Sequence, residues 1–152
     1  MRTVRWIASF LADRSTIISF DIFKSEVYKT TTGIPQGSPL SPILYLFYNA
    51  DLVETCNQEP NTIATGYIDD VAILRWGSST EETCNGLTRT MEKASIWARR
   101  HASVFAPSKF QLTHHTRRHQ IEIDRQVHID QTAICPAADS KYLGITLDTA
   151  LK

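Results

Sequence analysis

The stretch TGYIDDVAIL, residues 65–74, places two adjacent carboxylates inside a run of apolar and β-branched residues. Carboxylates are costly to bury without a partner. In a straight strand, successive side chains alternate between faces, so Asp69 and Asp70 would point in opposite directions. At the tip of a hairpin both can approach one point. We therefore expect a hairpin with residues 67–68 and 71–73 as its arms and the two aspartates at its tip.

The aspartate pair allows two interpretations. Two carboxylates ~4 Å apart repel by about 1 kcal/mol in water and by more inside a protein, and a divalent cation is the usual compensation. Mg²⁺ prefers oxygen ligands, often one or two carboxylates together with substrate phosphates. Two such ions can hold the attacking and leaving oxygens of a phosphoryl transfer. The alternative is an exposed turn, where aspartate is common and needs no metal.

The bulk composition is that of an ordinary globular protein. The chain has 152 residues, 42% of them hydrophobic, which corresponds to one domain over residues 1–152 or part of one. No apolar run reaches ~18 residues, so no membrane span is expected. The region after Met1 lacks a signal-peptide cleavage site. Cys56, Cys84 and Cys135 are odd in number and far apart, which favours reduced cysteines in an intracellular protein. The compartment stays open between nucleus, cytoplasm and mitochondrion.

The net charge is zero, but the charges are unevenly distributed. Residues 51–82 hold seven acids and one base, whereas residues 89–119 hold seven Lys or Arg, four His and one acid. An acidic block beside a basic one suits a metal site next to a polyanion track, and it also suits two solvated faces of different sign. A zinc site is a further alternative for HHTRRH, using His114, His115, His119 and Cys135, although their spacing fits no standard zinc pattern.

Hydrophobic periodicity and capping signals predict three helices. Residues 2–14 carry apolar side chains at helical spacing. A second helix should begin with Ser41 as N-cap and Pro42 in its first turn. Its expected apolar face consists of Ile43, Leu44, Phe47, Ala50 and Val53. A capping box at residues 79–82 opens a third helix that ends near His101. Its expected apolar face consists of Leu87, Met91, Ala94 and Ala98.

Short alternating runs predict the strands. STIISFDIFKSEVYKT should form two strands with a turn near residues 23–25. KFQLTHH, QIEIDRQVHI and KYLGITLD predict small antiparallel strands in the last third of the chain. Between them, TTGIPQGSPLSP is a loop because it holds two glycines and three prolines in twelve residues. Helices and strands in this order give an α+β fold.

The stretch GIPQGSPLSPILYLFYNADL, residues 33–52, carries more information. Gly33 and Gly37 allow close approach of the backbone to a ligand, and amides at the start of the following helix favour an anion such as a triphosphate. Followed by GYIDDVAIL, this stretch resembles blocks B and C of a reverse transcriptase, with the closer likeness to non-LTR (LINE-type) retrotransposon polymerases of fungal genomes. FAPSKFQLTHHTRR resembles block D, and KYLGITLD resembles the block E hairpin called the primer grip. WIASFLADRST resembles the segment before block B.

The resemblance implies a partial palm with an antiparallel sheet, a YIDD hairpin and packed helices. It also implies an RNA template, a DNA primer and a dNTP as partners, and Mg²⁺, with Mn²⁺ as the alternative ion. The catalytic metal ligands would be Asp69 and Asp70, and Lys109 would be an acid for the pyrophosphate leaving group. The remaining expected site residues are Gln36, Gly37, Tyr67 and Ile68 for the nucleotide and Tyr142, Leu143 and Gly144 for the primer grip.

The chain departs from the family in one respect. The block A aspartate has no counterpart here, because Asp13 and Asp21 sit in a helix end and a turn. Fingers and thumb are also expected to be absent. The sequence therefore predicts a fragment of an RNA-directed DNA polymerase that is inactive alone. The second hypothesis is a non-catalytic nucleic-acid-binding module or an inert remnant of a mobile element, in which the basic residues 99–125 hold phosphates.

Overall fold

The computed structural model describes residues 2–117 and 122–151. The chain divides into two compact units, residues 1–41 and residues 42–152. Helices and short antiparallel strand pairs alternate along it, which confirms the predicted α+β class. None of the helices in the described part of the chain is long and apolar enough to cross a membrane.

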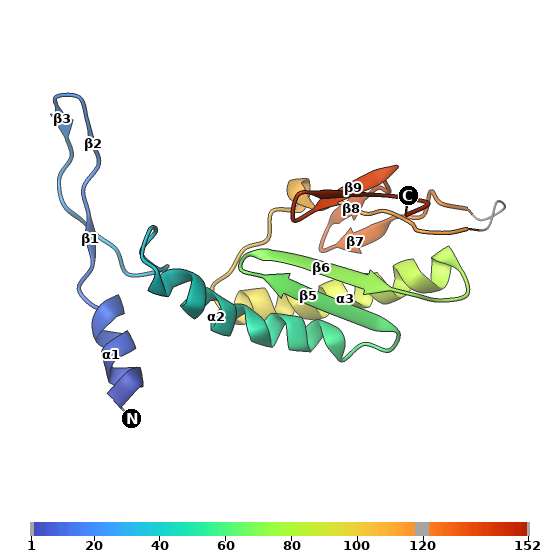
Figure 1. The fold of residues 1–152 in the computed structure, drawn as a ribbon, viewed down its shortest axis with the longest axis horizontal. Coiled ribbons are helices and arrows are strands. Elements are labelled where there is room, and N and C mark those ends of the chain that lie inside the picture. The colour runs from blue at the N-terminus through green and yellow to red at the C-terminus, as the bar shows by residue number, and fades with distance from the viewer. Residues whose placement is uncertain (1, 118–121, 152) are drawn as a thin grey trace. The chain divides into compact units, whose positions relative to one another are not determined.

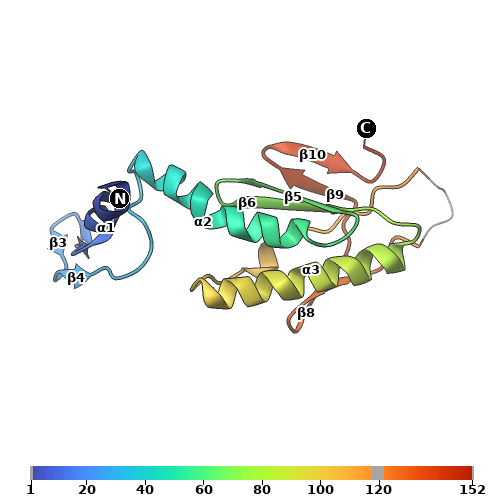
Figure 2. The same cartoon turned by 90° about the horizontal axis from the view of Figure 1, so that it is seen from below.

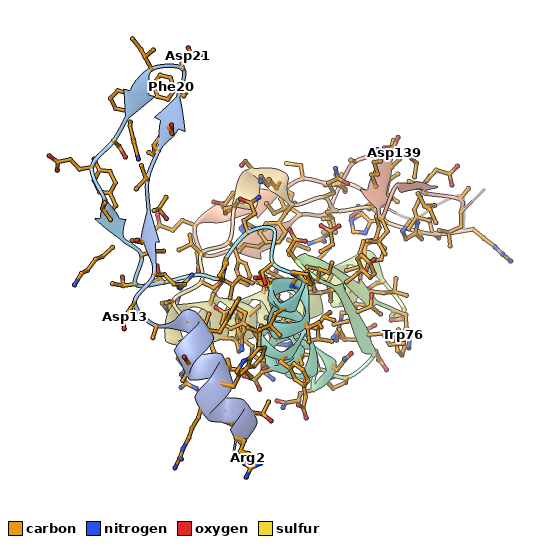
Figure 3. All side chains as sticks on the ribbon, turned by 60° about the vertical axis from the view of Figure 1, so that its left-hand side comes forward. Arg2, Asp13, Phe20, Asp21, Trp76 and Asp139 are labelled. Atoms are coloured by element: carbon orange, nitrogen blue, oxygen red, sulfur yellow. The ribbon has the colours of Figure 1, made fainter. Side chains whose placement is uncertain are left out.

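The first unit contains helix α1 (Arg2–Leu11), which ends before the predicted Arg14, and a long two-part hairpin. β1 (Ser15–Thr16) pairs with β4 (Tyr28–Lys29), and β2 (Ser19–Phe20) pairs with β3 (Phe23–Lys24). The turn lies at residues 21–22, so the prediction of a turn near residues 23–25 was wrong by two positions. Asp21 takes a positive φ of 48°, a conformation that aspartate tolerates in turns. Figure 3 labels Phe20 and Asp21 at this tip.

The second helix, α2 (Leu40–Asn57), begins before the predicted N-cap. Ser38 Oγ accepts a hydrogen bond from the Leu40 backbone N–H, whereas Ser41 Oγ donates to the carbonyl of Pro35. The predicted apolar face was right only at Val53, which packs against the core, because Ile43 is 51% exposed and Phe47 77% exposed. The helix instead buries Ser41, Asn49, Leu52 and Cys56. Apolar residues lie all around α2, so their spacing cannot identify the buried face.

The core of the second unit is formed by α2, by the hairpin of β5 (Thr62–Tyr67) and β6 (Asp70–Arg75), by α3 (Thr80–Arg100) and by the strand pair at residues 127–134. Ser79 caps α3 as predicted, accepting a hydrogen bond from Glu82 N–H, and the helix ends at its C-cap His101. The predicted residues Met91, Ala94 and Ala98 are buried. Figures 1 and 2 show β5–β6 between α3 on one side and the last hairpin of the chain on the other.

The last third of the chain forms two antiparallel pairs. β7 (Val127–Ile129) pairs with β8 (Thr132–Ile134), and β9 (Asp139–Tyr142) pairs with β10 (Ile145–Asp148). KFQLTHH does not form the predicted strand. Its first residue, Lys109, ends the short 3₁₀ helix Pro107–Lys109, and the segment contributes one isolated bridge, Leu112 to Pro136. QIEIDRQVHI is a strand only from residue 127, and its first two residues lie outside the described part.

A buried carboxylate connects α3 to the turn before β5. Glu59 is 9% exposed and lies 2.6 Å from Lys93 Nζ, with Arg89 Nε at 3.9 Å. The hydrogen bond from Lys93 lowers the pKa of Glu59, against burial, which raises it. A carboxyl with a lowered folded-state pKa stabilises the fold above its unfolded pKa of about 4.3, and this contribution is lost as the pH falls through the folded pKa.

We expect Glu59→Gln to reduce the free energy of unfolding by about 1 kcal/mol at pH 7, because a charged hydrogen bond is lost and Lys93 is half exposed. As the pH falls below about 4.3 and through the lowered pKa of folded Glu59, the wild type should approach the variant, because the carboxyl becomes protonated first in the unfolded and then in the folded state. Urea unfolding at pH 7 and pH 3 measures both values. Glu54→Gln, at an exposed position of α2, is the control. An equal loss at both pH values would contradict the assignment.

Candidate active site

The two aspartates lie at the tip of a hairpin, as predicted, but the turn begins one residue earlier than expected and Asp70 is the first residue of β6. β5 and β6 pair in register from Thr62↔Arg75 to Tyr67↔Asp70, which leaves Ile68 and Asp69 as a two-residue turn. Asp69 and Asp70 are exposed at this tip, and Tyr67 is 59% exposed. The adjacent carboxylates are therefore accessible to a ligand from solvent.

Helix α2 contacts the turn. Asn49 Nδ2 donates a 3.0 Å hydrogen bond to the carbonyl of Ile68. Tyr45, one helical turn earlier, has its pKa raised by burial and, to a smaller extent, by the negative charge of Asp69 and by Tyr48. Two side chains of α2 thus interact with the tip: Asn49 with the Ile68 carbonyl, and Tyr45 with the charge of Asp69.

The metal chemistry of the tip can be tested against the residues present. Two carboxylates match the oxygen preference of Mg²⁺ and supply part of a ligand set. Within residues 2–117 and 122–151, however, no group of three or more His, Cys, Asp or Glu side chains could hold a metal ion. Asp13 and Asp21 both take positive φ in turn or bend positions, in agreement with their predicted local roles.

The last hairpin lies beside the acidic one. β9 and β10 are joined by Leu143 and Gly144, whose φ values of 49° and 84° are both positive, as in type I′ turns. The Tyr142 hydroxyl lies 3.3 Å from Thr65 Oγ1, so a hydrogen bond connects β9 to β5 two residues before Tyr67. The structure therefore brings the predicted primer grip and the aspartate hairpin together.

A cysteine–histidine pair elsewhere in the second unit lacks the features of a nucleophile. Cys84 Sγ lies 3.9 Å from His114 Nε2, but that nitrogen is also 2.9 Å from the carbonyl of Arg125, to which only an N–H can donate. Burial raises the pKa of Cys84, which disfavours the thiolate. His115 Nδ1 lies 2.8 Å from the carbonyl of Asp148. These contacts occupy two of the histidines of the zinc alternative, and its His119 lies outside the described residues.

Comparison with known proteins now decides the family. A family model described as reverse transcriptase (RNA-dependent DNA polymerase) matches residues 1–147. This chain belongs to the reverse transcriptase family. It is 31% identical to the RNA-directed DNA polymerase from mobile element jockey and 27% identical to the probable RNA-directed DNA polymerase from transposon BS, both of Drosophila melanogaster. Each alignment covers 95% of this chain and 16% of the relative, so the chain spans about one sixth of their length.

A third relative is the probable RNA-directed DNA polymerase from transposon X-element, also of Drosophila melanogaster, at 25% identity with the same coverage. No solved structure matches the chain. The predicted resemblance to the reverse transcriptase of a mobile element is thus confirmed. Reverse transcriptases as a family use divalent metal ions and act on a nucleic-acid template and primer with dNTPs.

The other residues that the resemblance singled out are exposed. Lys109 ends the 3₁₀ helix, and no hydrogen bond or ion pair among the described residues connects its side chain to Asp69 or Asp70. Gln36 and Gly37 form an exposed turn in the first unit, where Gly37 takes a φ of 87°. The roles of these residues in the reverse transcriptase reaction remain predictions.

The basic segment is partly engaged in ion pairs within the fold. Arg99 lies 3.8 Å from Asp130, and Arg125 lies 3.9 Å from both Glu81 and Glu122. All of these side chains are substantially exposed, so their pairing is weak enough for a phosphate to compete.

Sequence reasoning missed one residue of this region, Asn49. The signal was present, because it is an amide within the run ILYLFYNADLV, where apolar side chains prevail. A buried polar side chain in such a run needs a partner, and here the partner is the turn that carries Asp69.

Proposed function

We propose that this chain supplies the acidic tip and the primer-facing hairpin of the palm of an RNA-directed DNA polymerase from a retrotransposon. In the proposed reaction, the 3′-hydroxyl of a DNA primer attacks the α-phosphate of a dNTP on an RNA template, and pyrophosphate leaves. The observation that carries the proposal is the exposed Asp69–Asp70 pair at a hairpin tip, within a chain matched over residues 1–147 by the reverse transcriptase family.

Asp69 and Asp70 would hold Mg²⁺, or Mn²⁺ in its place, which neutralises developing charge and orients the phosphates when bound. Tyr67 and Ile68 would lie near the primer end and the nucleotide. Tyr142, Leu143 and Gly144 would support the primer from the neighbouring hairpin, which the Tyr142–Thr65 hydrogen bond favours. Gln36 and Gly37 would contact the nucleotide, and Lys109 would protonate the leaving pyrophosphate.

Two-metal chemistry needs carboxylates beyond this pair. The relatives are about six times longer than this chain, which leaves ample sequence for a further aspartate and for the fingers and thumb. We therefore propose that residues 1–152 act as part of a larger polymerase. Free cysteines at positions 56, 84 and 135 fit an intracellular site of action, in the nucleus or cytoplasm.

The test measures binding of the chain to an RNA template annealed to a DNA primer, with and without Mg²⁺ and the complementary dNTP. We expect affinity to fall with rising salt, because Lys and Arg contacts displace counterions from phosphates. We also expect Mg²⁺ with the correct dNTP to tighten the complex, whereas a mismatched dNTP does not. Nucleotide incorporation into the primer, measured in the same tubes, would support the proposal directly.

The alternative function gives a different result. If the chain is a nucleic-acid-binding module, the hybrid binds with the same salt dependence, but neither Mg²⁺ nor the matched dNTP changes its affinity. If a folded chain binds no hybrid at any salt concentration, both proposals fail and the inert remnant remains.

A further inference from the structure

We propose that Asn49 is a positioning residue for the acidic tip: its side chain fixes the turn that directs Asp69 and Asp70 toward a common ligand. This inference rests on the proposed function, because it assigns Asn49 a role in the metal site of that function. Asn49 lies on α2 and touches the turn, not the substrate, so it would act through Ile68.

The turn has a backbone conformation that needs support from the surrounding structure. Ile68 has a φ of +54°, which is unfavourable for a β-branched side chain. Such a conformation persists only where the surrounding structure determines it. The 3.0 Å hydrogen bond from Asn49 Nδ2 to the Ile68 carbonyl is a contact that does so. Asn49 is 6% exposed, so water cannot readily replace the bond.

Helix α2 approaches strand β5 closely at Gly66. A Cβ atom added at Gly66 would lie 3.0 Å from Val53 Cγ2 and 3.5 Å from Asn49 Nδ2. The glycine therefore leaves room for the helix to lie against the strand, two residues before the turn. A side chain there would press against Val53, so a glycine at position 66 suits the close approach of α2 to β5.

The chain also contains a matched control. Asn57, two helical turns after Asn49, donates from Nδ2 to the Ala64 carbonyl at 3.2 Å and accepts from the Ala64 N–H at 2.7 Å. Asn57 therefore connects α2 to β5, whereas Asn49 connects α2 to the turn. Loss of Asn57 should weaken the fold without redirecting the aspartates.

The experiment compares the wild type with Asn49→Ala and Asn57→Ala in the full 152-residue chain, at a temperature where all three are folded. Asn49→Leu, which keeps the side-chain volume, is the second variant if Asn49→Ala does not fold. Hydrogen exchange of the amides of residues 68–70 reports the order of the turn without any metal. Mn²⁺ affinity, measured from the broadening of NMR signals of the same residues, reports the site.

We expect Asn49→Ala to speed exchange at residues 68–70 and to weaken Mn²⁺ binding about tenfold, the lower end of what loss of a supporting residue costs a metal site. Asn57→Ala should speed exchange near residue 64 and leave Mn²⁺ affinity within about twofold of the wild type. If Asn49→Ala and Asn57→Ala weaken Mn²⁺ binding equally, or neither affects it, the positioning role is refuted. If the wild type binds no Mn²⁺ at the tip, the proposed function fails. The positioning role is tested separately, because unchanged hydrogen exchange at residues 68–70 in Asn49→Ala would refute it whether or not Mn²⁺ binds.

Discussion

Asp69→Asn is expected to abolish the tightening of the primer–template complex by Mg²⁺ and dNTP. Asparagine keeps the shape of the side chain but removes the charge that a divalent ion requires. Loss of a residue that only supports a metal ligand costs roughly 10- to 100-fold in affinity or activity, so loss of a direct ligand should cost more than about 100-fold. Titration with Mg²⁺ at fixed dNTP and hybrid concentrations measures the effect.

The matched control for this variant is Asp21→Asn. Asp21 is also exposed in a hairpin turn and takes a positive φ of 48°, which asparagine adopts readily. Both substitutions remove one exposed negative charge, so a general electrostatic effect on nucleic-acid binding would be similar in the two. If Asp21→Asn reduced the Mg²⁺ effect as much as Asp69→Asn, the assignment of the metal to the tip would be contradicted.

Asp69→Asn also has a structural readout. Because the charge of Asp69 contributes to the raised pKa of Tyr45, its removal should lower that pKa toward the ordinary value, leaving the larger effect of burial. An ultraviolet titration of tyrosine measures this change in the absence of metal and substrate. The titration therefore reports whether Asp69 lies near Tyr45 of α2, independently of any activity.

Trp97→Ala is expected to have the largest effect on stability. Trp97 is 5% exposed in α3, its Nε1 donates a 3.0 Å hydrogen bond to Asp51 Oδ2, and its ring stacks on His101 with centroids 4.4 Å apart. Truncating a buried tryptophan costs about 3–5 kcal/mol. This is a large share of the 5–15 kcal/mol of a typical domain. The midpoint of thermal unfolding should therefore fall by more than about 10 °C.

Trp76→Ala provides the comparison. Trp76 follows β6, is 50% exposed, and hydrogen-bonds through its backbone N–H to the carbonyl of Asn61, a bond that the substitution retains. Its loss should cost under about 1 kcal/mol, because substitutions on the surface seldom cost more. Circular dichroism melts of both variants compare the two positions. Similar midpoints for the two would contradict the packing of α3 against α2.

The parts of the site that could be predicted from sequence depend on local rules. Asp69 and Asp70, flanked by strand-forming residues, predicted the tip, because a hairpin is the arrangement that lets neighbouring strand residues converge. The turn at Leu143 and Gly144 came from the resemblance to the block E hairpin, and the structure has a two-residue turn there. Ser79 predicted the start of α3, since its hydroxyl can accept from the N–H three residues later.

What could not be predicted depends on tertiary contacts. The buried face of α2 is set by tertiary packing, because Leu52 and Cys56 share a core with Ala64 of β5 and with residues of α3, while the sequence places apolar residues on every side of the helix. The hydrogen bond of Asn49 could not be predicted, because its partner is the Ile68 carbonyl, nineteen residues later in the sequence. Polar and apolar residues alternate in KFQLTHH as they do in a strand. The segment nevertheless pairs with a neighbouring segment through a single β-bridge, so no ladder of backbone hydrogen bonds forms.

The central claim is that the carboxylates of Asp69 and Asp70 hold a divalent ion at the tip of the YIDD hairpin. The most direct test is the paramagnetic broadening of backbone NMR signals by substoichiometric Mn²⁺ in the 152-residue chain. The account predicts that broadening centres on residues 67–71, extends to Tyr45 on α2, and disappears in Asp69→Asn. Broadening centred elsewhere, or broadening at the tip that persists in Asp69→Asn, would contradict it.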